Sequence, residues 1–394
     1  MASWHPHQER YVELFDPQAF ERMKEEVMHG KKFEAGFRLS EVPVFMPDGF
    51  ERQLLSATHF LIDQVQDPAF LANSKTAIPD QYRVPGEEGD RPRFLQFDFA
   101  IAEENGECVP KLIELQAFPS VFAYQYAVDR GYREYGLVPE GWTTLQDGIS
   151  DEEFLELFRE AVLGGHEPEN VVLLEADPVK QHTAIDFAYT EDLTGIHTVC
   201  LSEVRKSGAE LYYERDGKKI PIRRIYNRVI FDHLETAELE SDFDLLDHAD
   251  VEWAIHPNWY FRISKHSLPH LYGPYVPEST LLSDLSAIPD DLSEYVLKPL
   301  YSFAGSGVKL GPSREDVESC ADPENTILQR KVKYAEVIAT PFEPSKAELR
   351  MMIIWNDKPV VTQTLARVSR GAMSNVSKNQ DHTWVGSSAA YYER

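Results

Sequence analysis

The sequence predicts a mixed α/β (α+β) protein, in which an open α/β unit lies between a helical N-terminal segment and a C-terminal part that mixes helices with strands. Three observations predict this class: helical apolar spacing before residue 75, a strand pair near residue 100, and a helix–strand succession over residues 151–203. The 394 residues suffice for two or three structural units.

The N-terminal segment is predicted to be helical. An Asp-Pro pair at Asp16 opens a run that ends near Gly30, with apolar residues such as Phe20 and Met23 at helical spacing. A second amphipathic helix is expected from Gly49 to about Ser74. We expect both helices to cover a core and to carry no chemistry.

A β-hairpin is predicted next. Residues 91–102 alternate apolar and polar side chains, a turn follows, and residues 110–115 resume the extended pattern. Asp98 and Glu114 lie inside these apolar strands, and Gln116 faces the same side as Glu114. Such oxygen donors suit Mg²⁺, although acidic strand residues also occur on solvated faces.

An open α/β unit follows the hairpin. Its predicted elements are a helix over 151–163, a strand over 170–175, a helix after Lys180 and a strand over 197–203. A turn at Asp216-Gly217 then leads into residues 220–230. Tyr226, Asn227 and Arg228 lie at the carboxyl end of that stretch, which is where open α/β sheets bind ligands.

The segment Tyr295–Gly311 (YVLKPLYSFAGSGVKLG) indicates a phosphate site. Lys298 lies in an apolar strand that precedes a Ser/Gly loop. The backbone N–H groups of such a loop can bind phosphate oxygens. The loop residues are Ser302, Gly305, Ser306 and Gly307. A simple hairpin with a glycine-rich turn is the alternative interpretation.

Arginines on two further strand patterns add positive charge. Residues 348–355 carry Arg350, and residues 359–370 carry Arg367 and Arg370. Arginine binds phosphate oxygens or an anionic transition state through paired hydrogen bonds. Each of these arginines, taken singly, also fits a surface position.

The composition disfavours several classes of protein. The net charge of 39 − 66 = −27 argues against nucleic-acid and anionic-membrane partners. No stretch approaches the ~20 apolar residues of a membrane span, and the N-terminus does not resemble a signal peptide. Three widely spaced cysteines suit a reducing compartment, so we expect a cytoplasmic protein. P-loop and HExxH motifs are absent.

In the order of these segments, the chain resembles the ATP-grasp ligases, specifically the circularly permuted branch typified by the synthetase domain of glutathionylspermidine synthase. The resemblance runs from about Arg91 to the end, and LIELQAFPS precedes HPNWYFRISKHSLPHL and YVLKPLYSFAGSGV in it. It implies a circularly permuted ATP-grasp fold with ATP and Mg²⁺ as cofactors, and Lys298 and Arg350 as catalytic residues. The implied ligands are Asp98, Glu114 and Gln116 for the metal; Lys265, Lys298, Ser302, Gly305, Ser306, Gly307 and Arg350 for the phosphates; Gln329, Arg330 and Lys331 for the adenine; and Glu336 for the ribose or adenine.

Two positions depart from the family pattern. Gln96 stands where the family has an arginine two residues before the metal-binding aspartate, and Gln116 stands where it has an asparagine. Glutamine can still ligate Mg²⁺, so the second change is mild. The first change weakens the inference that the substrates are those of glutathionylspermidine synthase.

The resemblance also implies a division of the chain into four segments. These are an N-terminal helical segment (1–90), metal-binding strands of the ATP-grasp core (91–140), a pre-ATP-grasp-like α/β substrate unit (141–255) and nucleotide-binding lobes (256–394).

The expected activity is ATP-dependent joining of a small-molecule carboxylate to an amine through an acyl phosphate, with release of ADP and phosphate. The candidate substrate contacts are Ser120, Tyr226, Asn227, Arg228, Arg370 and Asn375. Two alternatives stay open, an ATP-binding regulatory protein without catalysis and a small-molecule phosphotransferase on the same fold.

Overall fold

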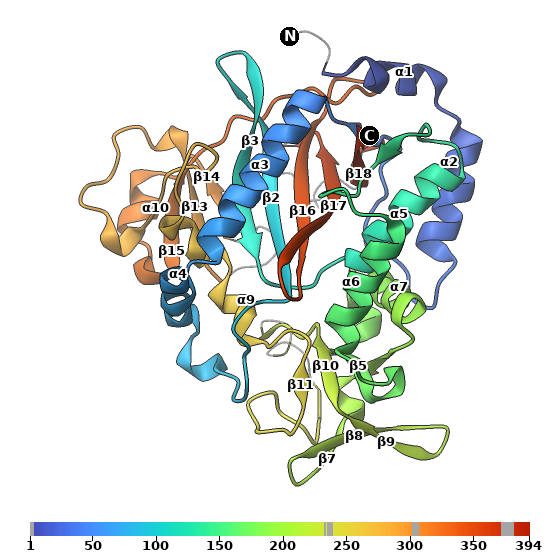
Figure 1. Ribbon diagram of the computed structural model, residues 1–394. Helices are drawn as coiled ribbons and strands as arrows, with labels where there is room; N and C mark the ends of the chain where they lie inside the picture. Colours follow the sequence, from blue (N-terminus) through green and yellow to red (C-terminus); the bar gives the residue numbers. More distant parts are fainter. Residues whose placement is uncertain (1–3, 232–233, 235–238, 302–306, 372–381) are drawn as a thin grey trace.

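A central sheet of seven strands organises the protein (Figure 1). The computed structural model describes residues 4–231, 234, 239–301, 307–371 and 382–394. The sheet order is β1-β18-β17-β16-β2-β3, with β4 paired to β18. The strands are β1 (Val44–Phe45), β2 (Phe94–Glu104), β3 (Glu107–Gln116), β4 (Trp142–Thr143), β16 (Lys346–Trp355), β17 (Pro359–Ser369) and β18 (Gly386–Glu393).

The predicted hairpin is confirmed as β2 and β3. Its two turn residues, Asn105 and Gly106, both have positive φ angles, as a tight turn between twisted strands requires. On its other edge β2 pairs with β16, so strands from opposite ends of the chain are neighbours. That pairing joins residues about 250 positions apart, and the sequence pattern carries no direct sign of it.

Helices cover the sheet and the flanking units. They are α1 (Pro6–Leu14), α2 (Pro17–Lys24), α3 (Asp48–Val65), α4 (Pro68–Asn73), α5 (Phe122–Glu134), α6 (Asp151–Leu163), α7 (Ala184–Thr194), α9 (Asn258–Arg262) and α10 (Arg314–Glu318). The first predicted helix is α2, extended by a π-helical turn over Glu25–His29. The second is divided into α3 and α4, because Asp67 caps a new helix whose first residue is Pro68. None of the described helices has the length and apolar character that a membrane span requires.

The predicted α/β unit is confirmed as a parallel sheet of order β11-β10-β5-β6, packed against α6 and α7. The strands are β5 (Val171–Glu175), β6 (His197–Cys200), β10 (Arg224–Asn227) and β11 (Glu252–Trp253). An antiparallel sheet of β7 (Arg205–Ser207), β8 (Glu210–Arg215) and β9 (Lys218–Ile222) extends from it, at the bottom of Figure 1. Residues 220–230 are therefore not one strand, because the chain passes from one sheet to the other after Ile222.

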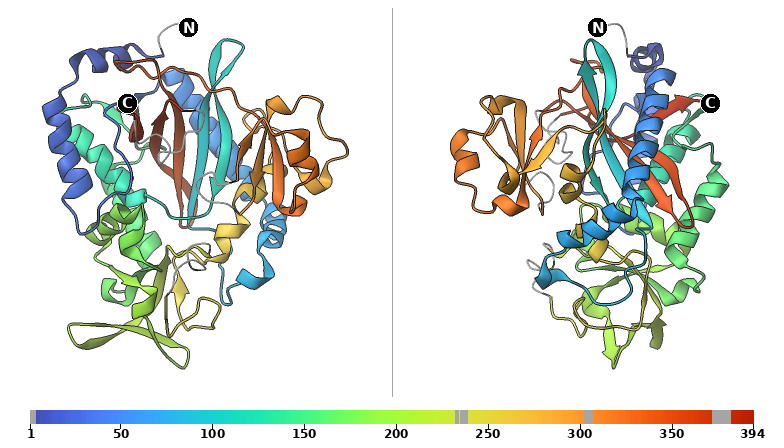
Figure 2. Two further views of the ribbon diagram at one scale, coloured as in Figure 1. Left: turned by 180° about the vertical axis from the view of Figure 1, so that it is seen from behind. Right: turned by 60° about the vertical axis from the view of Figure 1, so that its left-hand side comes forward.

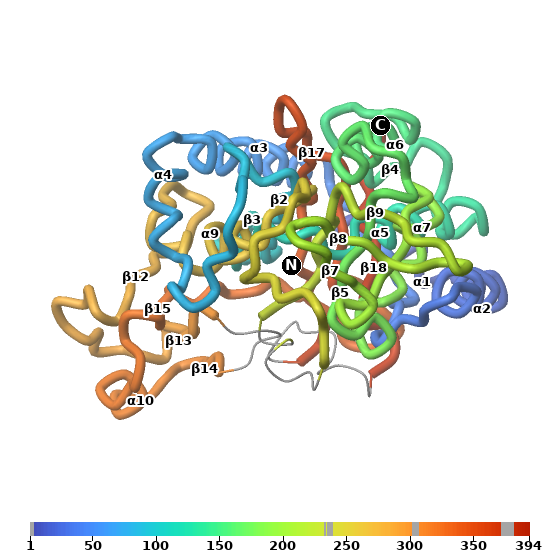
Figure 3. Tube along the Cα trace, turned by 90° about the horizontal axis from the view of Figure 1, so that it is seen from below, coloured from blue at the N-terminus to red at the C-terminus, as the bar shows by residue number. Residues whose placement is uncertain are grey.

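A third sheet forms a side lobe, which we define as β12–β15 with α10. It is antiparallel, in the order β12-β15-β13-β14. The strands are β12 (Ser279–Leu281), β13 (Tyr295–Pro299), β14 (Lys309–Leu310) and β15 (Thr326–Arg330). Figures 2 and 3 show the side lobe beside the β2–β3 end of the central sheet, with the α/β unit in a different direction. The central sheet thus connects the two smaller units.

Candidate functional site

One face of the central sheet carries charged side chains from four adjacent strands. Glu114 lies opposite Asp98, Asp98 lies opposite Arg350, and Glu348 lies opposite Arg367. Opposed residues of antiparallel strands point to the same face, as do residues two apart on one strand. The five side chains therefore form one group, which we call the charged row.

Asp98 is the centre of the charged row. Nε and Nη2 of Arg350 donate to its two carboxylate oxygens at 2.6 and 2.7 Å. Arg367 donates to Asp98 at 2.5 Å and forms an ion pair with Glu348 at 2.9 Å. Burial alone would raise the pKa of Asp98, but the two guanidinium charges outweigh it and hold that pKa well below its usual range.

The side lobe contributes Lys298, which projects from β13 toward β3. Its Nζ donates to the side-chain oxygen of Gln329 at 2.6 Å and to a backbone carbonyl of β3 at 3.1 Å. Burial lowers the pKa of Lys298 to about 8; the carboxylates of Glu114 and Glu348 oppose this shift, and the charge of Lys265 adds to it. Lys298 thus lies within electrostatic range of the charged row, and Lys265 lies within range of Lys298. Together these groups comprise four cations and three carboxylates.

Lys265 begins a short helical segment, Lys265–His270, directly after α9. The hydroxyl of Ser264 caps that segment by accepting a hydrogen bond from a backbone N–H. Upstream, Arg262 is buried, pairs with Glu88 at 2.6 Å and lies over the ring of Trp259. This anchored helix fixes the direction in which the Lys265 backbone enters the site.

The two glutamines that depart from the family pattern contact each other. Gln96 lies opposite Gln116, and the Gln116 amide donates to the Gln96 side-chain oxygen. Gln96 in turn donates to the carbonyl oxygen of Ser120 at 2.5 Å. The next residue, Val121, has φ +60°, a strained conformation for a β-branched side chain. The glutamine pair therefore supports the turn that follows β3.

The predicted magnesium ligands do not present a set of free oxygens in this arrangement. Both carboxylate oxygens of Asp98 are bonded to guanidinium groups, whereas Gln116 donates to Gln96 through its amide nitrogen and not through its oxygen. Glu114 alone has a carboxylate without a described partner. Across the described residues, no three His, Cys, Asp or Glu side chains are grouped to hold a metal ion. As arranged, Asp98, Glu114 and Gln116 do not fit a divalent cation.

The other residues of the implied ATP site lie in different environments. Gln329 is buried beside Lys298, whereas Arg330, Lys331 and Glu336 are exposed. The guanidinium of Arg330 lies 5.1 Å from the ring centre of Tyr295. The loop glycine Gly307 has φ +69°, and a side chain there would meet the ring of Pro299. Three further loop residues lie outside the described residues: Ser302, Gly305 and Ser306.

Three of the candidate substrate residues have structural partners in the α/β unit. Arg228 is buried and pairs with buried Asp186 at 2.5 Å. The hydroxyl of Tyr226 donates to a backbone oxygen in the turn after β3, and Asn227 bonds the backbone of Val229. These residues therefore hold the edge of the α/β sheet against that turn.

The remaining substrate candidates are dispersed. Ser120 lies in the turn held by Gln96, while Arg370 donates to the carbonyl of Thr383 and lies over the ring of Phe342. Asn375 lies outside the described residues.

Two charged residues of interest were not among the sequence candidates. Glu348 is two positions before Arg350, so strand alternation alone could have placed it on the same face. Glu175 ends β5 and is buried, and burial raises the pKa of its carboxyl to about 8, although the backbone N–H of Ala176 and the charge of Arg228 lower it. Sequence reasoning could have found Glu175 because it is the one acidic residue at the end of an otherwise apolar strand pattern.

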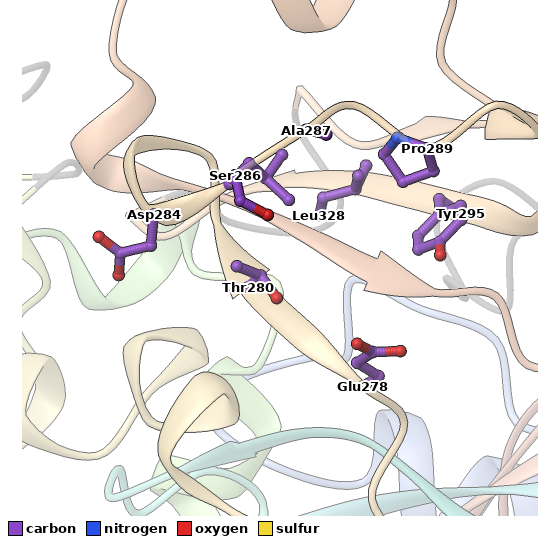
Figure 4. Close-up of a pocket in the computed structure, with 9 residues that line it drawn as sticks. Glu278, Thr280, Asp284, Ser286, Ala287, Pro289, Tyr295 and Leu328 are labelled. Carbon is purple, nitrogen blue, oxygen red and sulfur yellow. The ribbon is translucent and has the colours of Figure 1, made fainter.

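A cavity of about 250 Å³ lies in the side lobe, bordered by Glu278, Thr280 and Tyr295 (Figure 4). Leu328 also lines it, while the next residue, Gln329, bonds Lys298. Because successive strand residues point to opposite faces, the cavity opens on the face of the side-lobe sheet away from Lys298. It is therefore separate from the charged row.

Fold and site together define a mixed α/β protein with a group of cations and carboxylates where the central sheet meets the side lobe. Among solved structures, the chain resembles a glutathione synthetase-like effector from Globodera pallida in its apo form, with a TM-score of 0.61, 13% identity and 98% of both chains covered. At this identity the similarity shows a glutathione synthetase-like fold and nothing finer. No protein-family model and no curated protein sequence matches the chain.

Proposed function

We propose that the protein is an ATP-dependent carboxylate–amine ligase of the ATP-grasp type. One observation carries the proposal: Arg350 and Arg367 of the central sheet lie near Lys298 of the side lobe, and Lys265 lies near Lys298, in a molecule whose net charge is −27. These four cations outnumber the three carboxylates of the charged row, and the phosphates of a nucleotide would supply further acceptors and negative charge to them.

The topology supports the ATP-grasp assignment and the circular permutation. The hairpin β2–β3 precedes the side lobe in sequence, yet it pairs with β16, which follows the side lobe. The permuted branch has this order of segments. The glutathione synthetase-like fold of the solved neighbour supports the ligase class.

In the proposed reaction, a substrate carboxylate oxygen attacks the γ-phosphorus of ATP, and ADP leaves with the electrons of the broken P–O bond. The amine nitrogen then attacks the acyl carbon, phosphate leaves and the nitrogen loses a proton. Lys298 and Lys265 would neutralise the phosphates, and Arg350 and Arg367 would hold the transferring group. The acid and amine would bind toward the turn at Ser120, between the charged row and the α/β unit.

Nucleotide turnover with pooled substrates tests this function. The purified protein is supplied with Mg-ATP and pools of carboxylates and amines, ADP is resolved from AMP, and product masses are measured. A ligase produces ADP and a conjugate lighter by one water than its two substrates. A product heavier by one phosphoryl group would instead establish a phosphotransferase.

The variant Lys298→Ala tests the assignment of the ATP site. It should lose ATP turnover while its circular dichroism spectrum stays that of the wild type, because the substitution removes a buried cation and leaves the strand pairing in place. Retained turnover in this variant contradicts the assignment of the ATP site.

The second candidate function is nucleotide binding without catalysis. The pairing of both Asp98 oxygens with arginine favours it, because the carboxylate is not available to a metal in this arrangement. ATP binding without turnover in any substrate pool would support this candidate over the ligase.

A further inference from the structure

The side lobe contains a cavity that the proposed nucleotide site does not use (Figure 4). Its volume is about 250 Å³, whereas a single buried water molecule needs only about 10–15 Å³ of such space. Its walls come from the strands β12, β13 and β15 and from the segment 284–289 that follows β12. The cavity is therefore large enough for a small organic molecule.

The lining of this cavity combines apolar and acidic side chains. Leu285 and Leu328 supply an apolar surface. Glu278 and Asp284 supply two carboxylates, and Figure 4 shows Thr280 between them. None of the nine lining residues is a lysine, an arginine or a histidine. The lining therefore offers negative charge at two separate points beside an apolar surface.

The charged groups near the cavity do not neutralise its carboxylates. Within the described part of the chain, neither Glu278 nor Asp284 has a side-chain hydrogen bond or ion pair. Burial lowers the pKa of His270, although the charge of Asp284 opposes this shift, so the imidazole is uncharged at neutral pH. Arg330 shares the sheet face with the cavity, but its guanidinium lies over the ring of Tyr295. Both carboxylates can therefore accept hydrogen bonds from a cationic ligand.

The cavity and the contacts of Lys298 lie on opposite faces of the same strands. Thr280 lines the cavity, whereas its neighbour Ser279 accepts a hydrogen bond from the Gln329 amide at 3.1 Å. Leu328 also lines the cavity, whereas Gln329 accepts a hydrogen bond from Lys298 at 2.6 Å. A ligand in the cavity would therefore not contact Lys298, and its binding can be measured without a nucleotide.

We propose that this cavity binds a small aliphatic diamine. One ammonium group would pair with Glu278 and the other with Asp284, and the methylene chain would lie on Leu285 and Leu328. A monoamine can pair with only one of these carboxylates at a time, and a neutral diol pairs with neither. The site is separate from the proposed nucleotide site, and the inference does not depend on the proposed function.

Isothermal titration calorimetry of the full chain with putrescine, a four-carbon diamine, tests the proposal. Salt at about 0.15 M screens the diffuse attraction of a polyamine to an acidic protein. We expect one saturable site per chain, and Glu278→Gln and Asp284→Asn should each weaken binding about tenfold through loss of a charge-assisted hydrogen bond. The matched control Glu315→Gln removes the same charge from an exposed residue of α10 outside the cavity, and it should leave the affinity unchanged.

These variants should keep the fold, because all three carboxylates are exposed, and circular dichroism checks this. Butylamine should bind about tenfold more weakly than putrescine, and butanediol should not bind. The proposal is overturned by the absence of saturable binding to wild type, or by equal affinity in wild type and both cavity variants. An equal loss in Glu315→Gln also overturns it, because the attraction would then come from the net charge of −27. Nucleotide turnover is a separate measurement, so a failure of the ligase proposal leaves this result unaffected.

Discussion

Lys298 is the cation in the site whose charge responds to pH in the neutral range. Burial lowers its pKa to about 8, from an ordinary 10.5, whereas arginine side chains do not titrate in this range. The amine is also held by Gln329 and by a β3 carbonyl, both of which are acceptors that suit the protonated form. Lys298 is therefore a titrating cation beside the arginines of the charged row.

ATP affinity should consequently fall at alkaline pH. As pH rises through about 8, Lys298 in the free protein loses its proton, and binding a polyanion must restore it. We expect the association constant for ATP to decrease by up to about tenfold per pH unit above pH 8. Calorimetric titration from pH 7 to 9.5 measures this slope. In Lys298→Arg the slope should vanish, and the same slope in both proteins would assign the effect to another group.

The buried carboxyl of Glu175 leads to a separate prediction, which concerns how the free energy of unfolding depends on pH. Its carboxyl has a pKa of about 8 in the folded protein because of burial, against an ordinary 4.5, so folding favours the protonated form. The stability it contributes is complete below about pH 4.5 and is lost as pH rises toward and through 8. Glu175→Gln should therefore gain stability relative to wild type by about 1.4 kcal/mol per pH unit within this window.

Urea unfolding at several pH values between 5 and 9 measures that difference. The exposed residue Glu152, in the same α/β unit, provides the control variant Glu152→Gln. If Glu175→Gln and wild type keep a constant difference over this range, the buried carboxyl is not the source of the pH dependence.

The elements predictable from the sequence are those whose signal is local. Helix α6 begins at a capping box on Ser150 and ends at Gly164, as its cap residues and apolar spacing predict. The β2–β3 hairpin follows from alternation and from Asn105-Gly106. The pairing of β2 with β16 is different, because nothing within either strand specifies a partner about 250 residues away.

The end of α6 offers a test of that local signal. Gly164 and Gly165 both have positive φ, but a side chain at Gly164 would lie 2.6 Å from the Arg224 guanidinium, whereas Gly165 faces open space. We expect Gly165→Ala to cost about 1 kcal/mol through its backbone conformation. Gly164→Ala should cost clearly more, since buried Arg224 must also move. Urea unfolding compares the two variants, and equal losses would show that Arg224 adapts freely.

For the molecule as a whole, the candidate site depends on how the central sheet and the side-lobe sheet meet. The sequence places Asp98, Lys298 and Arg350 in strands, and their convergence follows from the β2–β16 pairing and the contact of the side lobe with β3. The pairing of Asp98 with two arginines could not be predicted, because charges on adjacent strands fit a metal site equally well until the register is known. Sequence reasoning therefore found most members of the site but not their partners.

A buried ion pair of the α/β unit also contacts the segment that follows strand β3 of the central sheet. Asp186 of α7 accepts hydrogen bonds from the backbone N–H groups of Val121 and Tyr124 at the start of α5, and it pairs with Arg228, which follows β10. One carboxylate thus connects a helix of the α/β unit, the strained turn after β3, and the carboxyl edge of the parallel sheet. The phenyl rings of Phe118 and Phe187 flank the guanidinium.

Removing either partner should destabilise the whole protein. Arg228→Met leaves the Asp186 carboxylate buried without its cation, and Asp186→Asn leaves the guanidinium without its anion, so each should cost about 3–5 kcal/mol. The double variant should cost much less than the sum, because it leaves no unpaired charge. A double-mutant cycle by urea unfolding measures this coupling. Additive losses would mean that Arg228 and Asp186 act independently. Arg228 would then again be a candidate for substrate binding.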